Sequence, residues 1–138
     1  MNFRSGIRKV AGALLAGILS GSVIAGSTFT GNGSVVITVS ASGGGSATGY
    51  IGHIYNGTGK TEFVRCQRGK WETQEQPYVN CWARNENGDE AWCTAFSSHL
   101  AKSITSISSD SKVTFRYNAA GDCTSITVVQ SSEFQDKR

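Results

Sequence analysis

The three tryptophans are the residues of this chain with the clearest capacity for recognition chemistry. Trp71, Trp82 and Trp92 lie close together, among further aromatic residues between positions 50 and 92. An indole ring stacks on the C–H surface of a sugar, while amide, carboxylate and guanidinium groups beside it bind the hydroxyls. We therefore predict a ligand-binding surface made by Trp71, Trp82, Trp92, Asn80, Arg84 and Glu90.

Segment 78–96 positions most of these residues as a β-hairpin. Two strand-like runs, each with a cysteine and a tryptophan, flank a loop over 86–88 in which Gly88 supplies a positive φ. The register gives an aromatic pair, an ion pair and a candidate disulfide: Trp82 with Trp92, Arg84 with Glu90, and Cys81 with Cys93. Strand alternation places the cysteines on one face and, on the other, Asn80, Trp82, Arg84, Glu90, Trp92 and Thr94.

The same aromatic face also suits a second layer of the core. Aromatic side chains are more often buried in a core than exposed at a binding site, so the pattern favours burial of Trp82 and Trp92. Trp71 lies in a polar stretch before Pro77 and is expected to be exposed. The exposure of the indoles therefore decides between a core layer and a binding surface.

The histidines are the first candidates for catalysis. His53 and His99, helped by Lys60, Arg65 or Lys102, could hydrolyse RNA by acid–base chemistry. Nothing in the sequence brings the two histidines together, so two surface histidines are the simpler interpretation. No serine after the leader lies in a Gly-x-Ser-x-Gly motif.

The carboxylates are the second candidates. A glycosidase would draw its acid and base from Glu62, Glu72, Glu75, Glu86, Asp89 and Glu90. Three of them cluster at the hairpin tip, where no apolar pocket can keep a carboxylate protonated. Asn85, Asn87 and Asp89 loosely resemble a calcium loop but lack the full ligand set. We predict no catalytic residue, no metal and no cofactor.

The four cysteines predict two disulfides. Cys66, Cys81, Cys93 and Cys123 form no Cys-x-x-Cys pair or Cys/His cluster of the kind that binds zinc. The hairpin register favours Cys81–Cys93 with Cys66–Cys123. The pairing Cys66–Cys81 with Cys93–Cys123 is the serious alternative, because directly cross-strand disulfides are geometrically demanding.

Residues 1–25 predict a signal peptide of bacterial style, cleaved before Gly26. A basic start precedes an apolar stretch over 10–23 that glycine and serine interrupt, and a membrane anchor of ~20 apolar residues is the alternative. Three of the 13 basic residues and none of the 10 acidic ones lie in this leader, so the mature chain is formally neutral. We expect a secreted or periplasmic protein that binds neither nucleic acid nor, after cleavage, a membrane.

Residues 26–138 read as one disulfide-stabilised, β-rich domain. Beside the central hairpin, alternation predicts strands over 34–40, 47–55, 61–66, 112–117 and 123–129, with an Asn56-Gly57 turn between the second and third. The spacing of Phe96, Leu100, Ile104 and Ile107 predicts one short helix capped by Ser97 or Ser98. We find no internal repeat.

The expected fold is mainly β, an antiparallel sandwich or open barrel with one short helix. The alternative is an α+β domain with one helix packed on an antiparallel sheet. The expected function is a non-catalytic binding module for a glycan or another cell-surface component. Two alternatives remain: a small exported hydrolase, ribonuclease-like or glycosidase, that uses His53 and His99, and a secreted enzyme inhibitor or interaction protein that presents the loop 68–77 to an extracellular protein. The sequence leaves the oligomeric state open.

Overall fold

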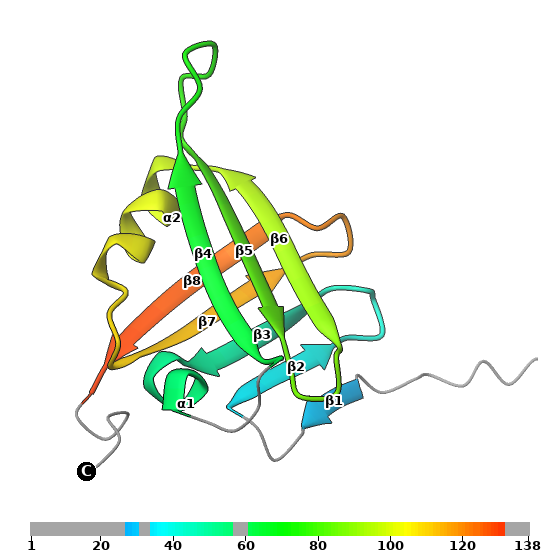
Figure 1. Ribbon diagram of the computed structural model, residues 1–138. Helices are drawn as coiled ribbons and strands as arrows, with labels where there is room; N and C mark the ends of the chain where they lie inside the picture. The colour runs from blue at the N-terminus through cyan, green and yellow to red at the C-terminus, as the bar shows by residue number, and fades with distance from the viewer. Residues whose placement is uncertain (1–26, 31–33, 57–60, 132–138) are drawn as a thin grey trace, which may run out of the picture.

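Two antiparallel β-sheets face each other across the core (Figure 1). The computed structural model describes residues 27–30, 34–56 and 61–131; the predicted signal peptide and the turn residues 57–60 lie outside them. The first sheet has the order β1-β2-β3-β7-β8, with bounds Ser27–Thr30, Val35–Val39, Gly45–Tyr50, Ser111–Tyr117 and Cys123–Gln130. The second has the order β4-β5-β6, with bounds Phe63–Gly69, Tyr78–Arg84 and Glu90–Phe96. The prediction of a mainly β fold with two disulfides is confirmed.

Alternating side chains of both sheets fill the space between them. The five-stranded sheet contributes Val35, Ile37, Ala47, Val113 and Phe115, and the three-stranded sheet contributes Val79, Cys81, Ala83, Ala91 and Cys93. The predicted alternation of 34–40 and 112–117 is confirmed by this burial. The alternation predicted for 123–129 is interrupted, because the buried residues Cys123 and Ile126 are three apart and the pairing with β7 shifts register between Arg116 and Tyr117. No helix in the described part of the chain is long and apolar enough to cross a membrane.

The predicted strand over 47–55 is only half correct. The strand β3 ends at Tyr50, and residues Ile51–Asn56 form the helix α1. Ile51 and Ile54 both pack against the core, which a helix allows because residues three apart share a face, whereas a strand would separate them. The predicted Asn56-Gly57 turn implied that the strands on either side of it pair as a hairpin; this pairing is also wrong, since β3 and β4 belong to different sheets.

The predicted helix is present and begins where the sequence indicated. The helix α2 spans Ser98–Ser103 and continues as the 3-10 turn η1 over Ile104–Ser106. Its N-cap is Ser97, whose Oγ accepts a hydrogen bond from Leu100 N at 3.3 Å. Ala101 and Ile104 are buried as α2 and η1 pack against β8 (Figure 1).

The favoured disulfide pairing is wrong and the alternative is correct. Cys66 bonds Cys81, and Cys93 bonds Cys123. The predicted register is nevertheless right, because Cys81 does lie opposite Cys93. On the central strand β5, however, Cys81 also lies opposite Cys66 of β4, so the hairpin register alone could not select its partner.

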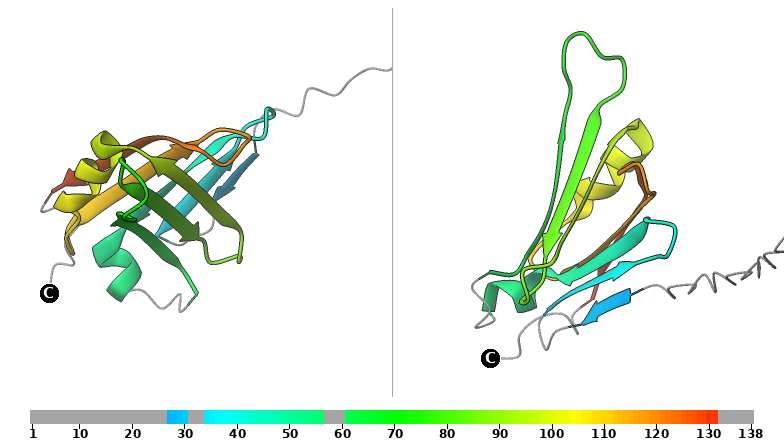
Figure 2. Two further views of the ribbon diagram at one scale, coloured as in Figure 1. Left: turned by 90° about the horizontal axis from the view of Figure 1, so that it is seen from above. Right: turned by 90° about the vertical axis from the view of Figure 1, so that its right-hand side faces the viewer.

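The second disulfide joins the two sheets at one corner. Beside Cys93–Cys123, the backbone of β6 meets the turn between β7 and β8, where Thr94 N donates to the carbonyl of Gly121 at 3.0 Å. Thr94 and Asp122 form an isolated parallel bridge there. Figure 2 shows the sheets in profile and the connection between β4 and β5, residues 70–77, rising beyond them; we call it the β4–β5 arm. This corner brings the β7–β8 turn beside the outer face of the three-stranded sheet.

Candidate functional site

The outer face of the three-stranded sheet carries the predicted binding residues. We call this surface the aromatic face; its outward side chains are Phe63, Arg65, Gln67, Tyr78, Asn80, Trp82, Arg84, Glu90, Trp92, Thr94 and Phe96. The predicted hairpin register is confirmed in full, including Trp82 opposite Trp92 and Arg84 opposite Glu90. This sheet lies in front in Figure 1, and no described helix or strand covers it.

The three-stranded sheet turns its large side chains outward and its small ones inward. Its buried face consists of valine, alanine and cysteine, whereas five aromatic residues lie on the outer face. Trp92 is 58% exposed and Phe96 51% exposed. The expectation that the paired indoles form a core layer is therefore wrong for Trp92, because the core lies on the opposite side of this sheet and no described helix or strand covers the aromatic face.

Trp82 is held in place by its neighbours on the same face. The guanidinium of Arg65 lies over its ring, with Cζ 4.6 Å from the ring centroid, and Phe63 meets it edge-on at 5.3 Å. Both contacts stabilise an indole by electrostatic attraction to the ring. Its Nε1 is buried without a hydrogen-bond partner in the described part of the chain. Trp82 thus forms a fixed wall, while Trp92 remains open to solvent.

A hollow of about 320 Å³ lies between the two indoles. It is lined by Asn80, Trp82, Glu90 and Trp92, all of which the sequence predicted as ligand-binding residues. Arg84 does not line it but holds Glu90 through an ion pair and hydrogen bonds from Nε and Nη2 to Oε1. The hollow therefore offers two ring surfaces, an amide and an oriented carboxylate.

The third predicted tryptophan lies elsewhere. Trp71 sits on the arm between β4 and β5, where its ring is 5.5 Å from that of Tyr78 and 58% of the residue is exposed. It lines a separate shallow hollow with Lys70 and Glu72. Its predicted exposure is confirmed, but the structure does not bring it to Trp82 and Trp92.

Two residues that support the wall of the hollow were not predicted from the sequence. Phe63 and Arg65 belong to β4, and they reach Trp82 because Arg65 pairs with Trp82 across the strands. The alternation of Phe63, Arg65 and Gln67 could have indicated an outward face. Only the pairing of β4 with β5, however, shows that this face adjoins the indoles.

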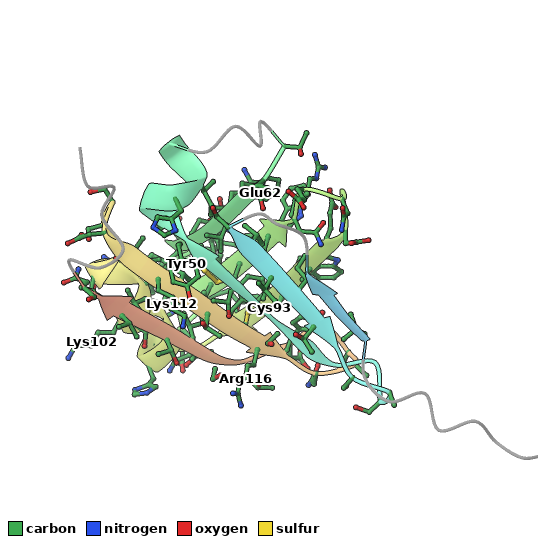
Figure 3. The ribbon with its side chains drawn as sticks, turned by 90° about the horizontal axis from the view of Figure 1, so that it is seen from below. Tyr50, Glu62, Cys93, Lys102, Lys112 and Arg116 are labelled. Atoms are coloured by element: carbon green, nitrogen blue, oxygen red, sulfur yellow. A yellow bond between two sulfur atoms is a disulfide. The ribbon has the colours of Figure 1, made fainter. Side chains whose placement is uncertain are left out.

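The two histidines lie on different elements. His53 is on α1, where its ring stacks on Tyr50 at 5.5 Å. Lys112 Nζ lies 5.2 Å from the same Tyr50 ring, on the outer side of the five-stranded sheet (Figure 3). His99 is exposed on α2. No contact between His53 and His99 is recorded in the described part of the chain.

Among the candidate carboxylates, Glu62 and Asp89 take part in structural hydrogen bonds. Glu62 accepts hydrogen bonds from the backbone N–H groups of Ser34 and Val35, at 3.3 and 3.2 Å, and so ties the chain before β4 to β2. Asn85, fully buried, uses Oδ1 to accept from the N–H groups of Asn87 and Asp89. The oxygen that the calcium hypothesis required is thus engaged by the turn itself.

The cysteine sulfurs form the one group that could suit a metal among the described residues. The sulfurs of Cys81, Cys93 and Cys123 lie within 4.8 Å of one another, between the sheets (Cys93 is labelled in Figure 3). All of them are already bonded in the two disulfides. They therefore brace the site from below instead of binding a ligand.

The comparisons with known proteins add no relative. No protein family, no curated protein and no solved structure matches the chain, so its function has to be argued from its own residues.

Proposed function

We propose that this chain is an exported, non-catalytic binding module whose aromatic face binds a glycan. The observation that carries the proposal is the hollow between Trp82 and Trp92, edged by Asn80 and Glu90. Apolar ring surfaces beside a few fixed polar groups suit a ligand that is itself apolar on its ring faces and polar at its edges. A pyranose has that character.

The exposed surface of Trp92 is large enough to contribute a measurable binding free energy. With 58% of the residue exposed, on the order of 100 Å² of indole is available, worth about 2–3 kcal/mol if all of it were covered. A sugar covers one side of the ring, which leaves about 1.5 kcal/mol, or about tenfold in affinity.

Titration of the protein with glycans, followed by tryptophan fluorescence, tests the proposal. The panel consists of glucose, N-acetylglucosamine and their β-1,4-linked oligomers. We expect Trp92→Ala to weaken binding about tenfold or more, because the open ring is lost. Trp71→Ala is the matched control, since it removes an equally exposed indole that lies outside the hollow. No spectral change with any glycan of the panel would refute the proposal.

The polar residues of the hollow give a second test of the same site. Asn80→Ala and Glu90→Gln keep both indoles but remove an amide and a negative charge from the rim of the hollow. We expect weaker binding with both variants, since each lost hydrogen bond to a ligand costs about 0.5–1.5 kcal/mol. Binding that depends on the indoles alone would point to a general apolar ligand instead of a sugar.

One observation favours an inhibitor or interaction protein as the second candidate. The β4–β5 arm projects beyond both sheets (Figure 2). It is braced at its base, where Gln76 Oε1 accepts from Ser98 N at 3.1 Å and from Ser98 Oγ at 2.6 Å. A braced projecting arm suits insertion into a partner. Rapid cleavage of the native protein by trypsin after Arg68 or Lys70 would argue against this candidate.

A further inference from the structure

A second hollow adjoins the first on the other side of Trp92. Its volume is about 200 Å³, and it shares Trp92 and Glu90 with the hollow between the indoles. Its remaining lining comes from β6 and from two turns of the other sheet: Ala91, Gly43, Tyr117, Asn118, Ala119, Ala120 and Gly121. One exposed indole therefore separates two neighbouring depressions, the first within the three-stranded sheet and the second between that sheet and two turns of the other.

The β7–β8 turn that lines the second hollow has a defined shape. Asn118 Oδ1 accepts from the N–H groups of Ala120 and Asp122, at 3.0 and 2.9 Å, and its Nδ2 donates to the Asp122 carboxylate at 3.0 Å. Gly121 completes the turn with a φ of +84°. The lining is thus ordered without a ligand, which reduces the entropy lost on binding.

The same turn is fixed against Trp92. Thr94 N donates to the carbonyl of Gly121 at 3.0 Å, and the disulfide Cys93–Cys123 joins the strands next to this contact. A Cβ atom at Gly121 would lie 3.4 Å from Cη2 and Cζ3 of Trp92, so the indole rests directly against the glycine. The position of one hollow relative to the other is therefore fixed.

From this geometry we infer that the two hollows are adjoining subsites of one site, occupied by consecutive units of a linear glycan. This inference rests on the proposed function. Trp92 lies between the subsites and contacts both units, and Glu90 is within reach of both. The first subsite is walled by a second indole, whereas the second is lined mainly by main chain and small side chains. The first subsite therefore holds a ring by stacking, and the second adds affinity by hydrogen bonds and shape.

A blocking substitution tests the second subsite alone. Ala120→Phe places a ring in the second hollow, at an exposed turn position where no core packing is disturbed. The chain offers a matched control in the β5–β6 turn: Asn87 stands at the same position of an Asn-x-x-Gly-Asp turn with the same backbone hydrogen bonds. Asn87 lines neither hollow, so Asn87→Phe adds the same ring away from the site.

The probes are glucose and N-acetylglucosamine, each as the single unit and as β-1,4-linked oligomers of two to six units. NMR titration measures weak binding of single units and reports the indole of Trp92 and the amide of Gly121 separately. We expect single units to shift the indole signal alone and oligomers to shift both. We also expect oligomers to bind the wild type about tenfold or more tightly than single units. Ala120→Phe removes this gain and Asn87→Phe keeps it.

The outcomes separate the two proposals. If Trp92→Ala abolishes binding while Ala120→Phe binds the hexamer as the wild type does, the second subsite is refuted and the glycan-binding face stands. Equal affinity for single units and oligomers refutes the second subsite in the same way. If no probe shifts the indole of Trp92, the proposed function itself fails, and the inference that depends on it fails with it.

Discussion

The disulfide between the two sheets gives the sharpest prediction about stability. Cys93 and Cys123 are 30 residues apart. In the chain-entropy relation, a loop of that length corresponds to about 12 cal/mol/K, or about 3.6 kcal/mol at 25 °C. The shorter loop of Cys66–Cys81, with a separation of 15 residues, gives about 3 kcal/mol. We expect Cys93→Ala/Cys123→Ala to lower the free energy of unfolding by about 3.6 kcal/mol, plus the cost of the small cavity that replaces the buried sulfurs.

Urea unfolding of the wild type and both double variants, followed by tryptophan fluorescence and by circular dichroism, measures these losses. The two calculated entropy contributions differ by only about 0.6 kcal/mol. The test is therefore the size of the stability loss in each double variant, and not which of the two variants loses more. A loss under about 1 kcal/mol for Cys93→Ala/Cys123→Ala would refute the reasoning. It would mean that the hydrogen bond from Thr94 N to Gly121 and the packing of the two sheets already restrict the chain before the sulfurs are joined.

Three further changes test the local structure. Asn85→Ala should cost about 2–3 kcal/mol in urea unfolding, because it removes a fully buried amide that accepts from two backbone N–H groups. Asn118→Ala in the exposed turn should cost about 1 kcal/mol, and equal losses would contradict the role of burial. Ser97→Ala should cost about 1 kcal/mol by removing the N-cap of α2, and Ser97→Asp should retain most of it, as measured by thermal unfolding. Burial raises the pKa of Tyr117 above 10.0. The folded state therefore holds the phenolic proton more tightly than the unfolded state, so its contribution to stability is complete below about pH 10 and is lost as the pH rises through the folded pKa. Tyr117→Phe should flatten this alkaline decrease in unfolding experiments.

Local patterns in the sequence were sufficient to predict the register of the central hairpin. Alternation and a positive-φ glycine specify which residues of β5 and β6 are opposite each other, and the structure has that register. These local patterns were not sufficient to predict the disulfide pairing. Cys81 has a cysteine opposite it on both neighbouring strands, and the pairing of β4 with β5 is a contact that no local pattern specifies.

A repeated turn was visible in the sequence but was missed, whereas the second hollow was not visible there. The pentapeptides 85–89 and 118–122 share the pattern Asn-x-x-Gly-Asp, and they form the same turn with five equivalent hydrogen bonds. The conclusion that the chain has no repeated motif is therefore wrong at the level of its turns. The second hollow, in contrast, could not be predicted, because it exists only where the turn at 118–122 meets β6 across the two sheets.

The exposure of the aromatic face has a physical explanation in the residues beneath it. Ala83, Ala91 and Cys93 leave a thin inner layer on the three-stranded sheet, and Phe115 and Ile37 of the opposite sheet fill the space above it. Moving Trp92 to the inner side would cover the exposed part of its indole, on the order of 100 Å², and gain about 2–3 kcal/mol on the area scale, yet the register directs it outward. A sheet arranged for stability alone would have the opposite distribution of large and small side chains. The outward position of these aromatic residues is what the proposed glycan site requires, since a ligand would there cover surface that the fold leaves open.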